Sequence, residues 1–256
     1  ANNVGSAYLP ADEQSRFWID YAQGFYKVME RIRAKYPDVL IQACASGGGR
    51  VEYGALKYFD EVWTSDNTEA LSRARIQYGT SLFYPAVVMG SHVSATPNHQ
   101  TGNITPIKFR FDMACAGRLG MELQPRQMTD EERQFARRAI ASYKEYRDIV
   151  MQGDLYRIGT PYDDTGYYGV MYVSKDKKKA VLFTYCTLYQ SRTLVPKYRL
   201  YGLDAQTRYK IREQNVDKKR FWFDGGTFTG EYLNHAGINP NLSKIYDSAV
   251  FVLEAQ

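Results

Sequence analysis

Cysteine and histidine are scarce in this sequence, and their scarcity excludes several classes of site. Three of the 256 residues are cysteine and three are histidine. The cysteines lie far apart and form neither a CxxC pair nor a disulfide framework. The histidines show no HExxH or other metal-ligand spacing. The sequence therefore predicts no metal site and no cofactor. The six residues are Cys44, Cys115, Cys186, His92, His99 and His235.

The sequence also has no long apolar run and no strong net charge. No run is long enough to span a membrane, and no signal-peptide pattern is present. The net charge of +5 is modest for this length. One lysine cluster, at residues 174–179, is interpreted as a hairpin tip, and no nucleic-acid motif accompanies it. We therefore expect neither a nucleic acid nor a membrane as partner. The start Ala1-Asn2-Asn3 resembles the middle of a longer protein, so the compartment stays open.

Tyrosine is the abundant aromatic residue, with 22 copies against 12 phenylalanines and 3 tryptophans. Its apolar ring and polar hydroxyl suit wet clefts and carbohydrate surfaces. Half-buried strands also use tyrosine, and this accounts for most of the copies. With 44% hydrophobic and 24% charged residues, the chain can bury a large core.

Strand and helix patterns alternate in the first part of the chain. The pattern predicts helices over residues 12–35, 68–78 and 129–150. It predicts strands over residues 39–44, 61–65 and 82–89, and a fourth near 120–122, after a segment that is partly helical. The unusual loops follow the strand C-termini, as on the active face of a β/α barrel. Because a closed barrel needs eight strands, residues 1–153 are predicted to be the second half of a (β/α)8 barrel.

After Gly153 the pattern changes to short β-rich runs separated by turn residues. The runs cover residues 169–174, 180–185, 198–203, 208–213, 221–223 and 248–253. They predict a small antiparallel β-sandwich over residues 154–256. The expected fold class is therefore α/β followed by all-β, in two domains.

The motif Trp63-Thr64-Ser65-Asp66-Asn67-Thr68 offers a carboxylate at the end of a predicted strand. Asp66 suits general acid/base catalysis, because partial burial in a cleft favours the protonated acid. It could instead cap the helix that follows. Trp63 could form a platform for a sugar face or belong to the core.

The motif Cys44-Ala45-Ser46-Gly47-Gly48-Gly49-Arg50 forms a second candidate ligand loop. Without side chains, its glycines let a ligand reach the backbone N–H groups. A flexible turn is the alternative; a phosphate cradle is disfavoured by the lack of GxxxxGK[ST] and GxGxxG spacing. Cys44 has no neighbouring histidine to activate it as a nucleophile. A weak hydrogen bond to a sugar hydroxyl, or packing, is expected of it.

Residues 92–101 are predicted to form a long polar loop, in which two histidines flank Pro97-Asn98. His92 and His99 could line the cleft as neutral donors, or they could stabilise the loop through hydrogen bonds. The sequence favours neither role.

These two motifs, together with residues 76–81 (Ile-Gln-Tyr-Gly-Thr-Ser) and 92–100 (His-Val-Ser-Ala-Thr-Pro-Asn-His-Gln), resemble glycoside hydrolase family 36, the microbial α-galactosidases. The resemblance covers essentially the whole chain. The family fold is a β-supersandwich, a (β/α)8 barrel and a C-terminal β-sandwich, and this chain is similar to the later barrel strands and the last domain.

The resemblance implies a retaining mechanism with two carboxylates. Asp66 matches the acid/base of the family. Cys44 and Gly47 match positions that contact the galactose hydroxyls. The neighbouring positions that the resemblance implies for substrate binding or support are Ser46, Gly48, Arg50, Trp63 and Ser65.

The chain departs from the family pattern in one respect. The family nucleophile lies in a Lys-Trp-Asp-like motif at the end of the fourth barrel strand, and no such motif occurs here. Ala1 is expected to begin just beyond it, so the chain alone is expected to be inactive. The implied partners are a galactoside oligosaccharide and the missing N-terminal part of the enzyme, and a homo-oligomer is left open. The alternatives are an α-N-acetylgalactosaminidase, a raffinose-type galactosyltransferase of the same family, and a non-catalytic carbohydrate-binding fragment.

Overall fold

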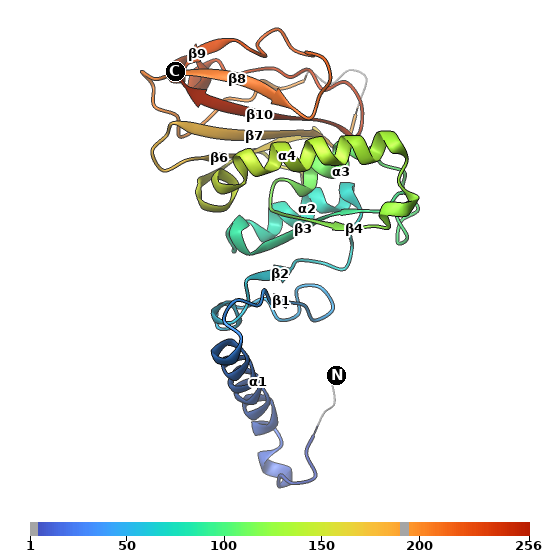
Figure 1. The fold of residues 1–256 in the computed structure, drawn as a ribbon. Helices are drawn as coiled ribbons and strands as arrows, with labels where there is room; N and C mark the ends of the chain where they lie inside the picture. The colour runs from blue at the N-terminus through green and yellow to red at the C-terminus, as the bar shows by residue number, and fades with distance from the viewer. Residues whose placement is uncertain (1–4, 190–194) are drawn as a thin grey trace. The chain divides into compact units, whose positions relative to one another are not determined.

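The computed structural model describes residues 5–189 and 195–256 (Figure 1). The chain consists of two compact units, Ala1–Val62 and Trp63–Gln256. None of the helices in the described ranges combines the length and apolar character needed to cross a membrane.

The first unit contains one long helix and one short parallel strand pair. Helix α1 (Arg16–Lys35) carries Arg33 and Lys35 in its last turn, where positive charge complements the helix dipole. Strands β1 (Gln42–Ala43) and β2 (Glu61–Trp63) pair in parallel. The predicted helix and strands are present, but β1 is shorter than expected because Val39 and Leu40 are exposed. The single-turn helices are η1 (Ala11–Glu13) and η2 (Ala55–Lys57).

The second unit begins with alternating helices and parallel strands. Helix α4 starts at a capping box, in which the Thr129 side chain accepts from the Glu132 N–H and Glu132 accepts from the Thr129 N–H. Strands β3 and β4 pair in parallel. The predicted helices near 70 and 130 and the strand near 120 are confirmed. The elements are α2 (Ala70–Thr80), η3 (Ala86–Val88), β3 (Met89–Ser94), α3 (Ile107–Ala114), β4 (Arg118–Glu122), η4 (Pro125–Gln127) and α4 (Asp130–Gln152).

The strand predicted over residues 82–89 is wrong. The apolar residues Leu82 and Phe83 are exposed, and the strand runs from Met89 to Ser94 instead. This strand is buried although it contains polar residues. Ser91 donates to Gln77 Oε1 (2.7 Å) and Ser94 donates to the Thr68 carbonyl (2.7 Å). Because these hydroxyls are satisfied, their burial costs little.

The last part of the chain forms a six-stranded antiparallel sheet in the order β5-β6-β7-β10-β8-β9. The lysine-rich segment lies in the turn between β6 and β7, as predicted, with Lys177 at a φ of 58°. A short helix, α5 (Gly230–His235), follows β9. The strands are β5 (Asp154–Gly159), β6 (Tyr167–Val173), β7 (Lys179–Cys186), β8 (Arg208–Gln214), β9 (Thr227–Thr229) and β10 (Asp247–Ala255).

Both faces of this sheet are covered, because alternate strand residues point to opposite sides. Tyr168, Phe183 and Val250 pack with residues of α3 and α4 on one face, where α4 runs along β6 and β7 (Figure 1). Loop residues and α5 cover the other face.

The second face of the sheet is not covered by another sheet, as the predicted β-sandwich would require. The described residues form one antiparallel sheet here instead of two packed sheets. The runs at 198–203 and 221–223 are not strands: Tyr198 makes only an isolated bridge to Ile238, and Phe223 lies in a turn. Their apolar side chains fill the core from irregular backbone. The covering residues include Tyr198, Leu200, Phe223, Leu233 and Leu242.

Candidate functional site

Asp66 lies in the loop that follows β2, and its carboxylate is oriented by a neighbouring ring. The indole Nε1 of Trp63 donates to Asp66 Oδ1 at 3.0 Å. Trp63 is buried, and its ring centre lies 4.6 Å from that of His92. Asp66 itself is exposed, so the expected partial burial is wrong. The exposed carboxylate is free to meet a ligand while one of its oxygens is held in place.

The helix after this loop is capped by a different carboxylate. The Glu69 side chain accepts hydrogen bonds from the backbone N–H groups of Leu71 (3.0 Å) and Ser72 (2.7 Å). The Glu69 N–H in turn donates to Asn67 Oδ1 at 3.1 Å. The alternative that Asp66 caps α2 is therefore wrong, and Asp66 has no structural duty at the helix terminus.

A buried arginine of α2 supports the same loop. Arg73 is 1% exposed and donates to Thr64 Oγ1 and, at 2.9 Å, to the Ser65 carbonyl. Its guanidinium carbon lies 5.1 Å from the Trp63 ring centre. Burial lowers the pKa of Arg73 to about 10, while Glu122 and Asp66 act in the opposite direction. Arg73 therefore carries its charge at neutral pH.

The predicted polar loop over residues 92–101 is divided between a strand and an anchored turn. His92 belongs to β3 and is half-buried against Trp63, whereas His99 is exposed. Gln100 Oε1 accepts from the Thr68 N–H at 3.1 Å, and Asn98 Nδ2 donates to Thr68 Oγ1 at 3.4 Å. This turn thus braces the backbone two residues after Asp66.

In the first unit, the glycine-rich loop after β1 is a tight turn with exposed polar groups. Ser46 and Gly47 both have positive φ, 52° and 71°. A Cβ on Gly49 would lie 2.4 Å from the Ala45 carbonyl oxygen, so only glycine fits there. Cys44, Ser46 and Gly48 are exposed, and Gly47 is buried. The loop therefore presents a thiol and a hydroxyl on a constrained backbone.

Arg50, at the end of this loop, contacts α1. Its Nη2 donates to the Tyr21 hydroxyl at 2.7 Å, and its guanidinium carbon lies 4.9 Å from the Phe25 ring centre. Through these contacts Arg50 ties the loop to the helix.

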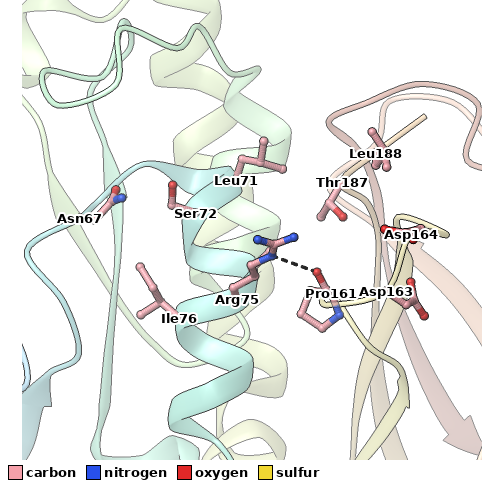
Figure 2. A pocket seen from close by; sticks show the side chains of 11 residues that line it. Asn67, Leu71, Ser72, Arg75, Ile76, Pro161, Asp163, Asp164, Thr187 and Leu188 are labelled. Atoms are coloured by element: carbon pink, nitrogen blue, oxygen red, sulfur yellow. Dashed lines mark hydrogen bonds between the residues drawn. The ribbon is translucent and has the colours of Figure 1, made fainter. Parts of the chain in front are cut away.

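A groove of about 510 Å³ runs along α2 and faces two loops of the antiparallel sheet (Figure 2). Arg75 Nε donates across it to the Pro161 carbonyl at 3.2 Å. None of the predicted site residues lines this groove, although Asn67, the neighbour of Asp66, does. The Asp66 side chain is therefore not part of the groove lining. Its lining includes Leu71, Ser72, Arg75, Ile76, Asp163, Asp164, Thr187 and Leu188.

Within residues 5–189 and 195–256, no group of three or more His, Cys, Asp and Glu side chains could hold a metal ion. The chemistry that these residues offer is that of a carboxylate, a thiol, hydroxyls and backbone groups.

Comparison with protein families agrees with the sequence motifs. The family model described as Melibiase matches residues 1–153, and that of the glycosyl hydrolase family 36 C-terminal domain matches residues 167–253. The chain belongs to glycoside hydrolase family 36. The parallel strands and the antiparallel sheet accordingly fit a barrel part and a C-terminal all-β domain of this family.

Curated relatives of this family 36 chain are α-galactosidases. Alpha-galactosidase AgaA of Geobacillus stearothermophilus is 36% identical over 253 residues, which cover 98% of this chain and 33% of AgaA. Alpha-galactosidase C of Emericella nidulans is 38% identical over 256 residues, which cover all of this chain and 32% of the relative. The chain thus spans about a third of the length of the relatives it matches.

Solved structures of family 36 enzymes have the same fold over this region. AgaA of Geobacillus stearothermophilus in complex with raffinose superposes with a TM-score of 0.90 at 36% identity, covering 99% of this chain and 34% of AgaA. The galactosidase domain of the α-galactosidase–sucrose kinase AgaSK superposes with a TM-score of 0.85 at 37% identity, covering 95% and 32%.

Two residues that support the loop around Asp66 are not among those predicted from the sequence, namely Arg73 and Glu69. Arg73 lies in the helix predicted over residues 68–78, where a charged residue is usually solvated. Glu69 is one of several capping candidates between Ser65 and Ala70. For Arg73 the only signal in the sequence is its place ten residues after Trp63, across a strand–loop–helix junction. In the fold this junction places the Arg73 guanidinium over the Trp63 ring.

Proposed function

We propose that the full-length protein is a retaining α-galactosidase and that this chain supplies its general acid/base, Asp66. The observation that carries this proposal is the exposed Asp66 carboxylate, held at one oxygen by Trp63 Nε1 at 3.0 Å. The relatives named α-galactosidases support the reaction class. Structures of AgaA in complex with raffinose and stachyose support α-galactosyl oligosaccharides as substrates.

The proposed chemistry has two steps. In the first, a nucleophilic carboxylate attacks the anomeric carbon while protonated Asp66 gives its proton to the glycosidic oxygen, so that the bond between them breaks and the rest of the oligosaccharide leaves with a free hydroxyl. In the second, the Asp66 carboxylate takes a proton from water, which attacks the anomeric carbon of the covalent glycosyl-enzyme and frees the nucleophile. The two inversions give galactose with retained configuration.

The proposal assigns the nucleophile to a part of the protein outside this chain. Residues 1–256 contain no Lys-Trp-Asp motif. In retaining enzymes the two carboxyl groups stand about 5–5.5 Å apart, so Asp66 alone cannot complete the reaction. We therefore expect no turnover from the 256-residue chain. In this proposal, residues 1–153 are the later half of the barrel and residues 154–256 the C-terminal domain, with the N-terminal part of the enzyme as their partner.

The glycine-rich loop is proposed to hold the galactose hydroxyls. The exposed Cys44 thiol and Ser46 hydroxyl can each make a hydrogen bond to a sugar hydroxyl, and the exposed backbone at Gly48 permits a close approach. Gly47, buried and at a positive φ, belongs to the same proposed binding loop and sets its turn. Arg50 supports this loop through its contacts to α1.

Two further residues are proposed to support the acid/base loop. Ser65 Oγ accepts from the Asn67 N–H at 3.1 Å, which shapes the turn around Asp66. Trp63 orients the carboxylate and offers the edge of a wall beside it.

Proton NMR of raffinose hydrolysis by the full-length protein tests this function. The proposal expects release of α-galactose before any β-anomer forms by mutarotation, and no hydrolysis of α-N-acetylgalactosaminides. Initial release of β-galactose would contradict the retaining mechanism. Transfer of galactose to sucrose without hydrolysis would favour the galactosyltransferase alternative. An inactive full-length protein would favour a carbohydrate-binding role.

A further inference from the structure

Arg73 makes its contacts with the residues that lead from β2 to Asp66. It donates to Thr64 Oγ1 and to the Ser65 carbonyl at 2.9 Å, and its guanidinium lies over the Trp63 ring at 5.1 Å. Trp63 in turn donates to Asp66 Oδ1 at 3.0 Å. Trp63 thus contacts both the buried cation and the carboxylate.

The burial of Arg73 is costly, and this sets it apart from Arg75, the other charged residue of α2, which is exposed. Arg73 is 1% exposed, and in the described part of the chain its Nε has no hydrogen-bond partner. Removing a guanidinium from water without full pairing is unfavourable. An apolar side chain at this position would avoid that cost, but it could not donate to Thr64 Oγ1 and the Ser65 carbonyl. Apolar packing alone therefore does not explain why an arginine occupies position 73.

The helix that carries Arg73 is fixed at its start. Glu69 caps α2 one turn before Arg73, and Ser94 binds the Thr68 carbonyl just before the cap. Arg73 therefore extends from the capped start of α2 to residues 64–65 at the end of β2. Arg73 thereby links α2 by hydrogen bonds to the loop that holds Asp66.

We propose that Arg73 is a positioning residue for the acid/base Asp66, acting through Trp63 and through residues 64–65. The inference rests on the proposed function, because it assigns Arg73 a part in that reaction. Arg73 does not touch the substrate. Its planar guanidinium donates in two directions and lies against an indole at the same time, which a lysine ammonium cannot do.

The first test is made on the 256-residue chain and needs no activity. The three tryptophans give three indole N–H resonances in a nitrogen-correlated NMR spectrum, and Trp63→Phe assigns one of them. In Arg73→Lys the Trp63 resonance is expected to shift and its protection from solvent exchange to fall, while those of Trp18 and Trp222 stay in place. Thr64→Val, which removes one acceptor of Arg73, is expected to move the same resonance by less. If Arg73→Lys does not fold, Thr64→Val takes its place in this test.

Arg75→Lys is the matched control. Arg75 lies on the same helix, is exposed and donates to Pro161, away from the Asp66 loop. It is expected to leave the Trp63 resonance unchanged. An unchanged Trp63 resonance in both Arg73→Lys and Thr64→Val would overturn the inference.

The second test is made on the full-length protein and separates the inference from the proposed function. Arg73→Lys is expected to lower kcat on raffinose by about 10- to 100-fold, a loss typical of a displaced catalytic group, with KM nearly unchanged. Arg75→Lys is expected to keep both constants. If Asp66→Ala abolishes raffinose hydrolysis and Arg73→Lys keeps full kcat, the inference fails and the proposed function stands. If Asp66→Ala leaves raffinose hydrolysis intact, the proposed function itself fails, and with it the role of Arg73.

Discussion

The indole N–H of Trp63 and the carboxylate of Asp66 form a hydrogen bond of 3.0 Å across three positions of the chain. Trp63 is the last residue of β2, so the backbone turns immediately after the strand and brings residue 66 back beside residue 63. The strand end and the acid therefore move as one unit. Because Trp63 is buried and Asp66 is exposed, the core of the fold fixes a carboxylate that remains accessible.

Trp63→Phe tests the contribution of the indole N–H. The variant keeps a ring against His92 and Arg73 but removes the donor to Asp66. Since hydrogen bonds to charged groups contribute about 1.5–3 kcal/mol, we expect kcat/KM of the full-length protein on raffinose to fall by about 10-fold or more. Trp222→Phe, at an exposed position, is the control and should leave the kinetics unchanged. Wild-type kinetics in Trp63→Phe would mean that the bond does not orient the acid.

Gly120→Ala tests the contact between β4 and His92. An added Cβ would lie 2.4 Å from His92 Cδ2, so the imidazole must leave its place against Trp63. Overpacking of this kind costs about 1–3 kcal/mol, which urea unfolding of the 256-residue chain can measure. Gly24→Ala in α1 meets no atom within 4 Å and should instead stabilise the chain by about 0.5–1 kcal/mol. Equal stability of the Gly120→Ala variant and the wild type would show that His92 is free to move.

Asp112 joins α3 to the antiparallel sheet and should be important for stability. It is fully buried and accepts from Asn215 Nδ2 (3.0 Å), from Ser248 Oγ (2.8 Å) and from Lys108 Nζ. Asp112→Ala leaves these donors unpaired, and we expect a loss of about 3–5 kcal/mol in the free energy of unfolding. Asp148→Ala, whose side chain is 92% exposed, should change it by less than about 0.5 kcal/mol. Similar losses in the two variants would argue against this buried network.

Buried tyrosines predict a loss of stability at alkaline pH. Burial raises the pKa of Tyr143 to about 12, and it also raises the pKa of Tyr168 and of Tyr185. In the unfolded chain tyrosine ionises near pH 10, so above that pH the unfolded state holds fewer protons than the folded state. The stabilisation is complete below about pH 10 and is lost as the pH rises towards 12. Solvent-exposed tyrosines ionise first, and the later rise in tyrosinate absorbance, from the buried tyrosines, should therefore coincide with the loss of far-ultraviolet circular dichroism. Full tyrosine ionisation with unchanged circular dichroism would contradict this prediction.

The sequence predicted the elements whose signals are local. Thr129 and Glu132 mark the start of α4, and the lysine-rich turn marks the β6–β7 hairpin. It failed where burial depends on distant partners. Strand β3 contains Ser91 and Ser94, which look like loop residues until Gln77 and Thr68 satisfy their hydroxyls. The apolar residues at 198–203 indicate a strand, but in the fold they cover the sheet as irregular chain.

In the candidate site, too, the sequence predicts the residues with a local signal and misses those buried by distant partners. The motif around Asp66 could be found in the sequence because its residues are contiguous, and the structure brings Trp63 and Asp66 into contact. The support from Arg73 could not be predicted, since an arginine on a helix normally faces water. Its burial follows from the tertiary approach of α2 to the end of β2, which no local pattern encodes.

Asp66→Ala in the full-length protein, assayed on two substrates, tests the central claim most directly. Raffinose has a poor leaving group that needs a proton, whereas a nitrophenyl α-galactoside has a leaving group that departs without one. If Asp66 is the general acid, kcat/KM on raffinose should fall by on the order of 100-fold or more beyond the loss on the nitrophenyl substrate. Equal losses on the two substrates would contradict the assignment of Asp66 as the acid/base.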